Sequence, residues 1–342
     1  MKEIVNSNEL TSVVLILPYF GQFNNYFPYY LLSCASNPSI DWLIYTDNDK
    51  DYHYPDNVRV IKTTFEKFKN RIQANFSFRI GLERPYKLCD FKPTYGEALN
   101  DDIKGYDFWG HCDCDLIFGN IRKFITEDIF QKNDKIFSRG HLTLYRNVSE
   151  VNSFYRTQTN FDWVKILSDT KSYSFDEYPY MSNAWNMSDS PVFDELLFDD
   201  IRPGMDGLRP SKELKGGKSG PYHEGQTDTS SEYKKMRHIC YEMDYELPKL
   251  QRVYIKNNSL LKSEVLYVHF QKRNLFLGKE MITDFEANYK HILIVPNKII
   301  PSQTVEAYTV RKIKPAHYSV KDIKNKFITL IKRGTKFLLR IR

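Results

Sequence analysis

Residues 106–119 read YDFWGHCDCDLIFG, an apolar run that carries two aspartates two positions apart. Side chains alternate between the faces of an extended strand, so His111, Asp113 and Asp115 are expected on one face and the two cysteines on the other. Two carboxylates held this close repel each other unless a cation joins them. Hard oxygen ligands suit Mg²⁺ or Mn²⁺, which often keep open positions for substrate phosphates. The stretch therefore predicts a strand over residues 107–115 that carries a divalent metal site.

The chain before this stretch alternates between strand and helix signals. Strands are predicted at 12–17, 41–46 and 58–61, and helices at 26–35 and 65–78. Later signals indicate a helix over 90–99, one strand within 135–145 and another over 264–270. Alternation of this kind indicates an α/β fold with a mostly parallel central sheet wound by right-handed crossovers. Ligands of such sheets bind beyond the carboxyl ends of the strands, where Tyr19, Asp47 and the aspartate pair all fall.

Two further stretches, YKLCDFKPTYG at 86–96 and FSRGHLTLYRN at 137–147, flank the aspartate pair. With them the chain resembles glycosyltransferases of the GT-A type, whose Asp-X-Asp motif holds a divalent metal against the diphosphate of a nucleotide sugar. The resemblance spans residues 13–273 and is nearest to uncharacterised bacterial proteins grouped with capsule and surface-polysaccharide gene products. More distantly, the chain resembles retaining galactosyl- and glucosyltransferases. The resemblance implies a Rossmann-like GT-A fold and a UDP-sugar donor.

The resemblance also implies roles for residues on the donor side. Asp113, Asp115 and His269 would hold the metal, and Lys272 would touch the diphosphate. The alternative for His269 is a structural histidine at a strand end. Asp90 and Lys92 are similar to residues that hold sugar hydroxyls or shield the diphosphate; the alternative is surface charge at a helix start.

The pocket for the nucleoside is predicted from position and chemistry. The ring of Tyr19 would stack on the base, and the carboxylate of Asp47 would accept a hydrogen bond from a base N–H or a ribose hydroxyl. Ordinary loop roles for both residues remain open.

The acceptor side has two candidate segments, because Phe-Asp-Glu occurs at 175–177 and again at 193–195. The resemblance favours Asp176 and Glu177, placed where related enzymes carry an acidic residue under the acceptor. An inverting enzyme would use this carboxylate as a general base, and a retaining enzyme would use it to stabilise an oxocarbenium-like state. The distant resemblance favours retention, and the choice of triplet stays open.

Composition limits the class of protein. The chain has 342 residues, 15% aromatics and five cysteines, which show no paired framework and fit a reducing cytoplasm. No stretch has the length of a membrane span, and the first residues lack the apolar core of a signal peptide. Residues 309–342 hold eleven Lys or Arg against one Asp, a net charge of +10, which leaves −4 for the rest of the total of +6. Basicity confined to the tail argues against a nucleic-acid partner.

The tail is predicted to be a separate element. We expect a catalytic domain over residues 1–300 and a basic amphipathic segment over 301–342. Apolar residues recur there at helical spacing, at Val320, Ile323, Phe327, Leu330 and Ile331. A basic amphipathic helix of this kind indicates peripheral binding to an anionic membrane, here the inner face of the plasma membrane. The glycine-rich residues 203–220 are interpreted as a loop over the cleft or a plain linker.

The sequence as a whole predicts a metal-dependent glycosyltransferase that moves a hexose from a nucleotide sugar to a growing, lipid-linked bacterial surface polysaccharide. A nucleotidyltransferase acting on sugar phosphates is the first alternative, although residues 18–21 are not the glycine-rich phosphate loop such enzymes carry early in the chain. A non-catalytic glycan-binding protein is the second.

Overall fold

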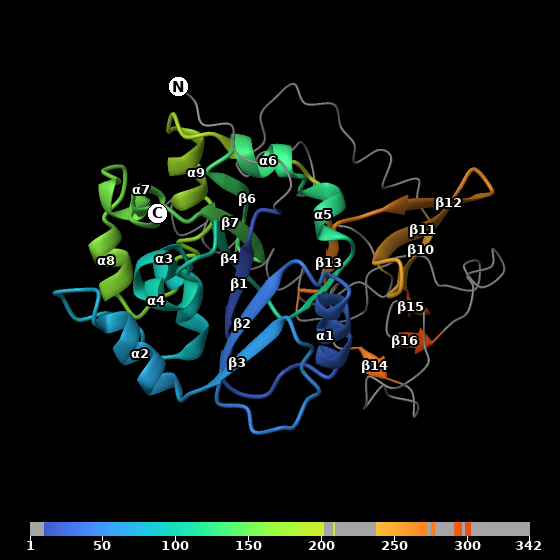
Figure 1. Ribbon diagram of the computed structural model, residues 1–342, viewed down its shortest axis with the longest axis horizontal. Coiled ribbons are helices and arrows are strands. Elements are labelled where there is room, and N and C mark those ends of the chain that lie inside the picture. The colour runs from blue at the N-terminus through green and yellow to red at the C-terminus, as the bar shows by residue number, and fades with distance from the viewer. Residues whose placement is uncertain are drawn as a thin grey trace, which may run out of the picture. The chain divides into compact units, whose positions relative to one another are not determined.

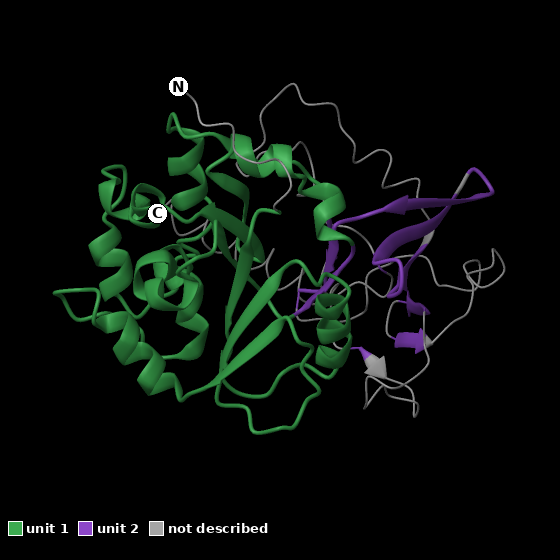
Figure 2. Ribbon diagram, viewed as in Figure 1, with its two compact units in different colours: residues 1–114, 120–197, 216–227 green, residues 115–119, 198–215, 228–342 purple. Residues whose placement is uncertain are grey.

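The computed structural model describes residues 10–201, 208, 237–271, 275–277, 291–295 and 298–301. These residues fall into two compact units, coloured separately in Figure 2. The first unit holds residues 10–114 and 120–197, and the second holds 115–119 together with the described residues from 198 onward. The predicted border at residue 300 stays a prediction, because residues 302–342 lie outside the described part of the chain.

The first unit is built on a seven-stranded sheet with the strand order β3-β2-β1-β4-β7-β6-β8 (Figure 1). Its strands are β1 (Val13–Pro18), β2 (Asp41–Thr46), β3 (Val58–Lys62), β4 (Phe108–Cys112), β6 (Lys135–Arg139), β7 (Leu142–Arg146) and β8 (Val192–Phe193). The four strands from β3 to β4 are parallel, β7 is antiparallel to both neighbours, and β6 is parallel to β8. A mixed α/β unit with a parallel-rich sheet confirms that part of the predicted fold.

Helices cover both faces of this sheet, which explains why β1 and β4 are buried along nearly their whole length. One core joins side chains of the sheet to those of α2 (Phe65–Gln73), α3 (Tyr95–Ala98), α4 (Asn100–Ile103), α7 (Ser149–Asn152), α8 (Trp163–Ser168), α9 (Met181–Asn186) and the 3₁₀ helices η1 (Pro85–Thr94) and η2 (Phe154–Thr157). The opposite face is covered by α1 (Phe27–Ala35), α5 (Ile121–Phe124) and α6 (Glu127–Lys132).

Four predicted elements differ from the structure. The strand predicted over 264–270 is confined to Tyr267–His269, because Glu264 ends the preceding strand. The helix predicted over 65–78 ends at Gln73. The side-chain Nε2 of Gln73 donates to the backbone carbonyls of Phe76 and Phe78, and this folds the chain back. The helix predicted over 90–99 is instead the 3₁₀ helix η1 followed by α3. The strand predicted over 107–115 ends at Cys112, and the chain turns before it forms the next strand.

The second unit contains two sheets. The larger has the order β12-β11-β10-β15-β16-β14, from β10 (Arg237–Asp244), β11 (Lys249–Lys256), β12 (Ser259–Glu264), β14 (Phe276–Leu277), β15 (His291–Val295) and β16 (Lys298–Pro301). The smaller has the order β5-β13-β9, from β5 (Leu116–Phe118), β9 (Asp199–Asp200) and β13 (Tyr267–His269). Strand β13 is antiparallel to β5 and parallel to β9. The small sheet therefore brings together three segments that are distant in sequence.

All five cysteines are free, as their spacing predicts. Within the described residues, none of the helices has the length and apolar character that crossing a bilayer requires.

Candidate functional site

Asp113 lies at the carboxyl end of β4, beside the end of β1 in the parallel part of the sheet. Its amide donates to the carbonyl of His141 at 3.0 Å, which continues the pairing of β4 with the hairpin that β6 and β7 form. Its side chain is 38% exposed. The first aspartate of the motif is therefore at the edge where an α/β sheet binds ligands.

Lys92 connects this carboxylate to a second one. Its Nζ lies 2.8 Å from Asp113 Oδ1, 3.6 Å from Asp176 Oδ2, and 2.6 Å from the carbonyl oxygen of Gly140. Burial alone would lower the pKa of Lys92, but the charges of Asp113 and Asp176 outweigh that effect and raise it. Lys92 therefore stays a cation between two carboxylates.

Gly140 makes room for the acidic pair at 176–177. Its amide donates to Glu177 Oε1 at 2.9 Å, and a Cβ at this position would lie 2.7 Å from both Asp176 Oδ2 and Glu177 Oε1. A side chain here would require these carboxylates to shift, so glycine suits the turn between β6 and β7 as the two carboxylates now lie. Burial raises the pKa of Asp176 to about 7, against the lowering effect of Lys92.

The second Phe-Asp-Glu triplet lies elsewhere in the first unit. Asp194 Oδ1 accepts a hydrogen bond at 3.2 Å from the backbone amide of Ser138, which lies on strand β6. Of the two triplets, the one at 175–177 is thus the one that the described structure brings to Lys92.

The second aspartate of the motif belongs to the second unit. Asp115 precedes β5, its carbonyl accepts from the amide of Phe270 at 2.9 Å, and its Oδ1 lies 3.4 Å from His269 Nε2. Because β5 pairs with β13, residues 115 and 269 meet although 154 positions separate them in the chain. Two of the three predicted metal ligands therefore lie together in this unit.

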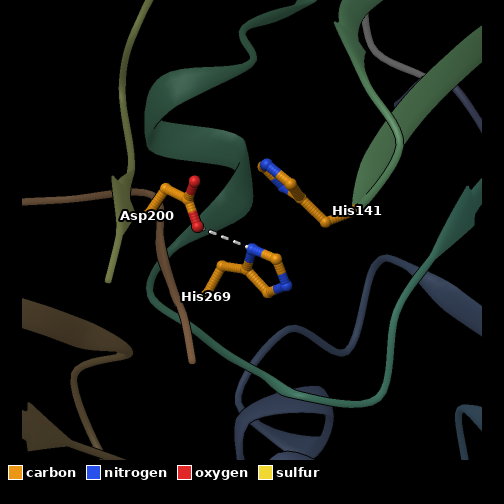
Figure 3. Close-up of side chains that lie close together, drawn as sticks. All are labelled: His141, Asp200 and His269. Carbon is orange, nitrogen blue, oxygen red and sulfur yellow. Dashed lines mark hydrogen bonds and ion pairs between the residues drawn. The ribbon is translucent and has the colours of Figure 1, made fainter. Parts of the chain in front are cut away.

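His269 has a carboxylate at each ring nitrogen. Its Nδ1 lies 2.9 Å from Asp200 Oδ1, the contact drawn as a dashed line in Figure 3. Burial would lower the pKa of His269, but its hydrogen bonds and the charges of Asp115 and Asp200 raise the pKa to about 10. Asp200 was not predicted as a site residue, because nothing in the sequence around 199–200 indicates that this segment pairs with β13.

His111 was predicted to share a face with the two aspartates, and it lies two positions before Asp113 on β4. It is 1% exposed on β4, with its ring 6.1 Å from that of Tyr145, and burial followed by the charges of Lys92 and Lys135 lowers its pKa well below the usual range. The pairing of β4 with β7 is continued at Asp113, whose amide donates to the carbonyl of His141. The strand itself ends at Cys112, so the alternation does not extend to Asp115.

Asp90 is fully buried under the 169–175 loop. Its carboxylate pairs with Lys87 Nζ at 2.7 Å and accepts from the amides of Tyr173 and Phe175 at 2.9 Å each. Lys87 in turn donates to the carbonyl of Ile166 at 2.9 Å. In this arrangement Asp90 contacts backbone and a lysine rather than facing outward.

Tyr19 and Asp47 lie in the loops that follow β1 and β2. Asp47 Oδ1 accepts from the amide of Gly21 at 2.7 Å, and Gly21 has φ of +103°. The ring of Tyr19 stacks on that of Phe23 with centroids 4.7 Å apart, and its hydroxyl donates to the carbonyl of Gln22. Both residues stand at the predicted edge, and their contacts within the loops are consistent with the loop roles left open.

Several predicted residues fall outside the described part of the chain. Lys272 is one of them, as are residues 302–342 and most of the glycine-rich stretch at 203–220. Their predicted roles stay predictions.

The donor atoms suit a hard divalent cation. Asp115 offers a carboxylate oxygen and His269 an imidazole nitrogen, and both side chains are about nine-tenths buried. Asp113 stands two residues earlier, so its Cα lies within about 7 Å of that of Asp115 by chain geometry alone. Carboxylate oxygens with one imidazole fit Mn²⁺ or Mg²⁺ better than a thiolate-seeking metal.

Comparison with known proteins gives a family but no activity. Residues 15–303 match the model of a family described as "Family of unknown function (DUF6625)". No curated protein matches the sequence.

Three solved structures are similar in fold to parts of the chain. A galactosyltransferase, LgtC, in complex with donor and acceptor sugar analogs is 12% identical, with 55% of this chain and 75% of that chain covered and a TM-score of 0.33. An active-site mutant of LgtC is 11% identical over 76% and 88% of the chains, with a TM-score of 0.38. The apo-form glycosyltransferase GlyE of Streptococcus pneumoniae TIGR4 is 13% identical over 54% and 46%, with a TM-score of 0.29. All three TM-scores lie below 0.5.

Proposed function

The chain belongs to the DUF6625 family, whose function is unknown, and from the residues that it brings together we propose that it is a metal-dependent glycosyltransferase. It would move a hexose from a UDP-sugar to a growing bacterial surface glycan, with a lipid-linked oligosaccharide as acceptor. The observation that carries the proposal is the pairing of Asp115 with His269 at 3.4 Å, because these two residues were predicted as metal ligands from distant parts of the sequence.

In this proposal Asp115 and His269 would hold Mn²⁺ or Mg²⁺, with a further oxygen from Asp113. When bound, the ion supplies Lewis-acid stabilisation of the diphosphate leaving group. Lys272 would add positive charge to the diphosphate.

Lys92 and Asp176 are proposed to act on the sugar. Lys92 is a cation, 12% exposed, that contacts Asp113 and Asp176, so it can orient both carboxylates and donate to a sugar or phosphate oxygen. Asp176 would lie under the transferred sugar and stabilise the oxocarbenium-like state of a retaining transfer, with Glu177 beside it. Tyr19 and Asp47 would line the nucleoside pocket. We propose that Asp90 positions the 169–175 loop instead of touching the donor.

Hydrolysis of nucleotide sugars without acceptor tests the proposal. With Mn²⁺ present, slow release of UDP from UDP-glucose or UDP-galactose is expected, and EDTA should stop it. Release or uptake of pyrophosphate would instead favour a nucleotidyltransferase. Glycan binding with no turnover of any nucleotide sugar would favour a non-catalytic glycan-binding protein.

A matched pair of variants tests the assignment of the acidic residue. Asp176→Asn should lower kcat while the affinity for UDP is preserved, because the amide keeps the volume but not the charge. Glu195→Gln, in the other Phe-Asp-Glu triplet, should leave kcat within about twofold, since an exposed substitution away from the chemistry is usually near neutral. The reverse result would transfer the role to the triplet at 193–195.

A further inference from the structure

Asp200 faces His269 because of how the small sheet pairs. Strand β9 runs parallel to β13 with Asp200 opposite His269, and the amide of Ile201 donates to the carbonyl of His269 at 2.9 Å. The carboxylate of Asp200 then lies 2.9 Å from Nδ1 of the same histidine (Figure 3). Backbone pairing and side-chain contact thus fix the same two residues against each other.

Asp200 is itself held in place. The side-chain Nε2 of Gln271 donates to both carboxylate oxygens of Asp200, at 2.6 Å each. The residue before it, Asp199, is fully buried and accepts from Arg252 Nε at 2.5 Å and from the hydroxyl of Tyr241 at 2.7 Å. Because Arg252 and Tyr241 come from β11 and β10, strand β9 is anchored to the larger sheet of the same unit.

This arrangement decides which ring nitrogen of His269 is offered to a ligand. A carboxylate at Nδ1 keeps a proton on that nitrogen. Nε2, which points to Asp115, is then the ring nitrogen that can bind a cation. We propose that Asp200 is a positioning residue, which holds His269 in the tautomer and ring orientation that present Nε2 to the divalent metal. The inference depends on the proposed role of His269 as a metal ligand. Asp200 itself would not touch the metal.

Direct titration with Mn²⁺ tests this without any turnover. The full chain, stripped with EDTA and dialysed, is titrated calorimetrically as wild type, His269→Ala, Asp200→Ala and Asp200→Asn. Removing a residue that orients a metal-binding histidine commonly weakens metal affinity 10- to 100-fold, so Asp200→Ala should raise the Kd for Mn²⁺ by about that factor. Asp200→Asn should also bind Mn²⁺ measurably more weakly than wild type, but by a smaller factor, because its amide oxygen can still accept from Nδ1 without the negative charge.

The chain offers a matched control in the same unit. Asp244 faces His291, with Oδ2 and Nδ1 3.7 Å apart across β10 and β15. Asp244→Ala removes a carboxylate from a histidine in the same way, and it should change the Kd for Mn²⁺ less than about twofold, since this pair is not part of the proposed site.

The outcomes separate this inference from the proposed function. If His269→Ala weakens binding and Asp200→Ala and Asp200→Asn both bind like wild type, the positioning role is wrong and the metal role of His269 stands. If wild type does not bind Mn²⁺, or His269→Ala binds as well as wild type, both are wrong. If Asp200→Ala does not fold, the decision falls to Asp200→Asn, for which unchanged affinity contradicts the inference and weakened affinity with a normal melting temperature supports it.

Discussion

At the scale of single residues, the two aspartates of the motif have different partners. Asp113 is hydrogen-bonded to Lys92 and Asp115 lies 3.4 Å from His269, so each carboxylate has its partner within its own unit. Neither carboxylate is part of an apolar core. Their removal is therefore expected to affect chemistry more than folding.

We predict that Asp115→Ala lowers transfer more than about a hundredfold, the usual order for loss of a main electrostatic stabiliser. Asp113→Ala should do the same, while circular dichroism of both variants stays like that of wild type. UDP release from a nucleotide sugar with Mn²⁺ is the measurement. Asp128→Ala, which removes an exposed carboxylate paired with Lys132, is the control and should retain full activity. Normal turnover by Asp115→Ala in the presence of EDTA would contradict the metal role.

Lys135 is a buried lysine whose charge the protein disfavours. Its side chain is 0% exposed, donates to Ser138 Oγ at 3.2 Å, and lies 5.6 Å from the ring centroid of Trp185. Burial lowers the pKa of Lys135 to about 7, although the charges of Asp194 and Asp176 oppose the change. Below pH 7 both folded and unfolded states carry the proton, and the full cost of the buried charge is present.

The stability of the protein should therefore respond to Lys135→Met in a pH-dependent way. Between about pH 7 and pH 10 the unfolded state binds more protons at this residue, so its contribution to the free energy of unfolding rises with pH. We predict that the stability gained by Lys135→Met over wild type shrinks by several kcal/mol from pH 6 to pH 10, since one pKa unit corresponds to about 1.4 kcal/mol. Urea unfolding at both pH values measures it. A gap of constant size for Lys135→Met across this pH range would refute the prediction.

At the scale of elements, the 3₁₀ helix η1 supports the acidic pair from two sides. Lys92 contacts Asp176 directly. One turn earlier, the buried Lys87 and Asp90 pair binds the backbone of the 169–175 loop, which leads into Asp176. This 3₁₀ helix therefore positions the carboxylate both through its side chain and through the loop before it.

We predict that Asp90→Asn speeds hydrogen exchange at the amides of Tyr173 and Phe175 by tenfold or more, because a hydrogen bond to a charged group is worth about 1.5–3 kcal/mol. Amide exchange followed by NMR measures it. Glu83→Gln, which weakens an exposed pair with Lys69, should leave both amides protected. Equal exchange in Asp90→Asn and wild type would mean that the loop is held without this carboxylate.

The predictable elements are those with a strong local signal. The first three strands were predicted within one residue at each end, because buried apolar runs bounded by turns are local features. The small sheet was not predictable, since two or three residues in each of β5, β9 and β13 give no local sign of which segments pair. For the same reason the sequence led to His269 and Lys92 only through resemblance, and it did not lead to Asp200.

At the scale of the whole molecule, the charge of the chain is concentrated in residues 309–342, outside the described residues. Each Lys or Arg near an anionic surface contributes roughly 1 kcal/mol, so a segment of +10 with an apolar stripe can bind a membrane. We predict that deletion of residues 320–342 releases the protein from anionic vesicles and lowers activity on lipid-linked acceptor, while hydrolysis of the donor persists.

Co-sedimentation with vesicles of anionic and of neutral lipid measures this, with full-length and truncated protein side by side. High salt should reproduce the deletion in part, because screening weakens the charges and leaves the apolar stripe. Equal pelleting of both proteins, or loss of the fold on truncation, would indicate that the segment packs on the protein instead.

The close approach at Gly140 has a consequence for the history of the family. A side chain at this position would meet Asp176 and Glu177 at once, so it requires both carboxylates to move or be lost. Among relatives, we expect covariation: a lineage that replaces the glycine should also have lost one of the two carboxylates. Such lineages would mark the branches in which the ancestral chemistry was abandoned while the fold was kept.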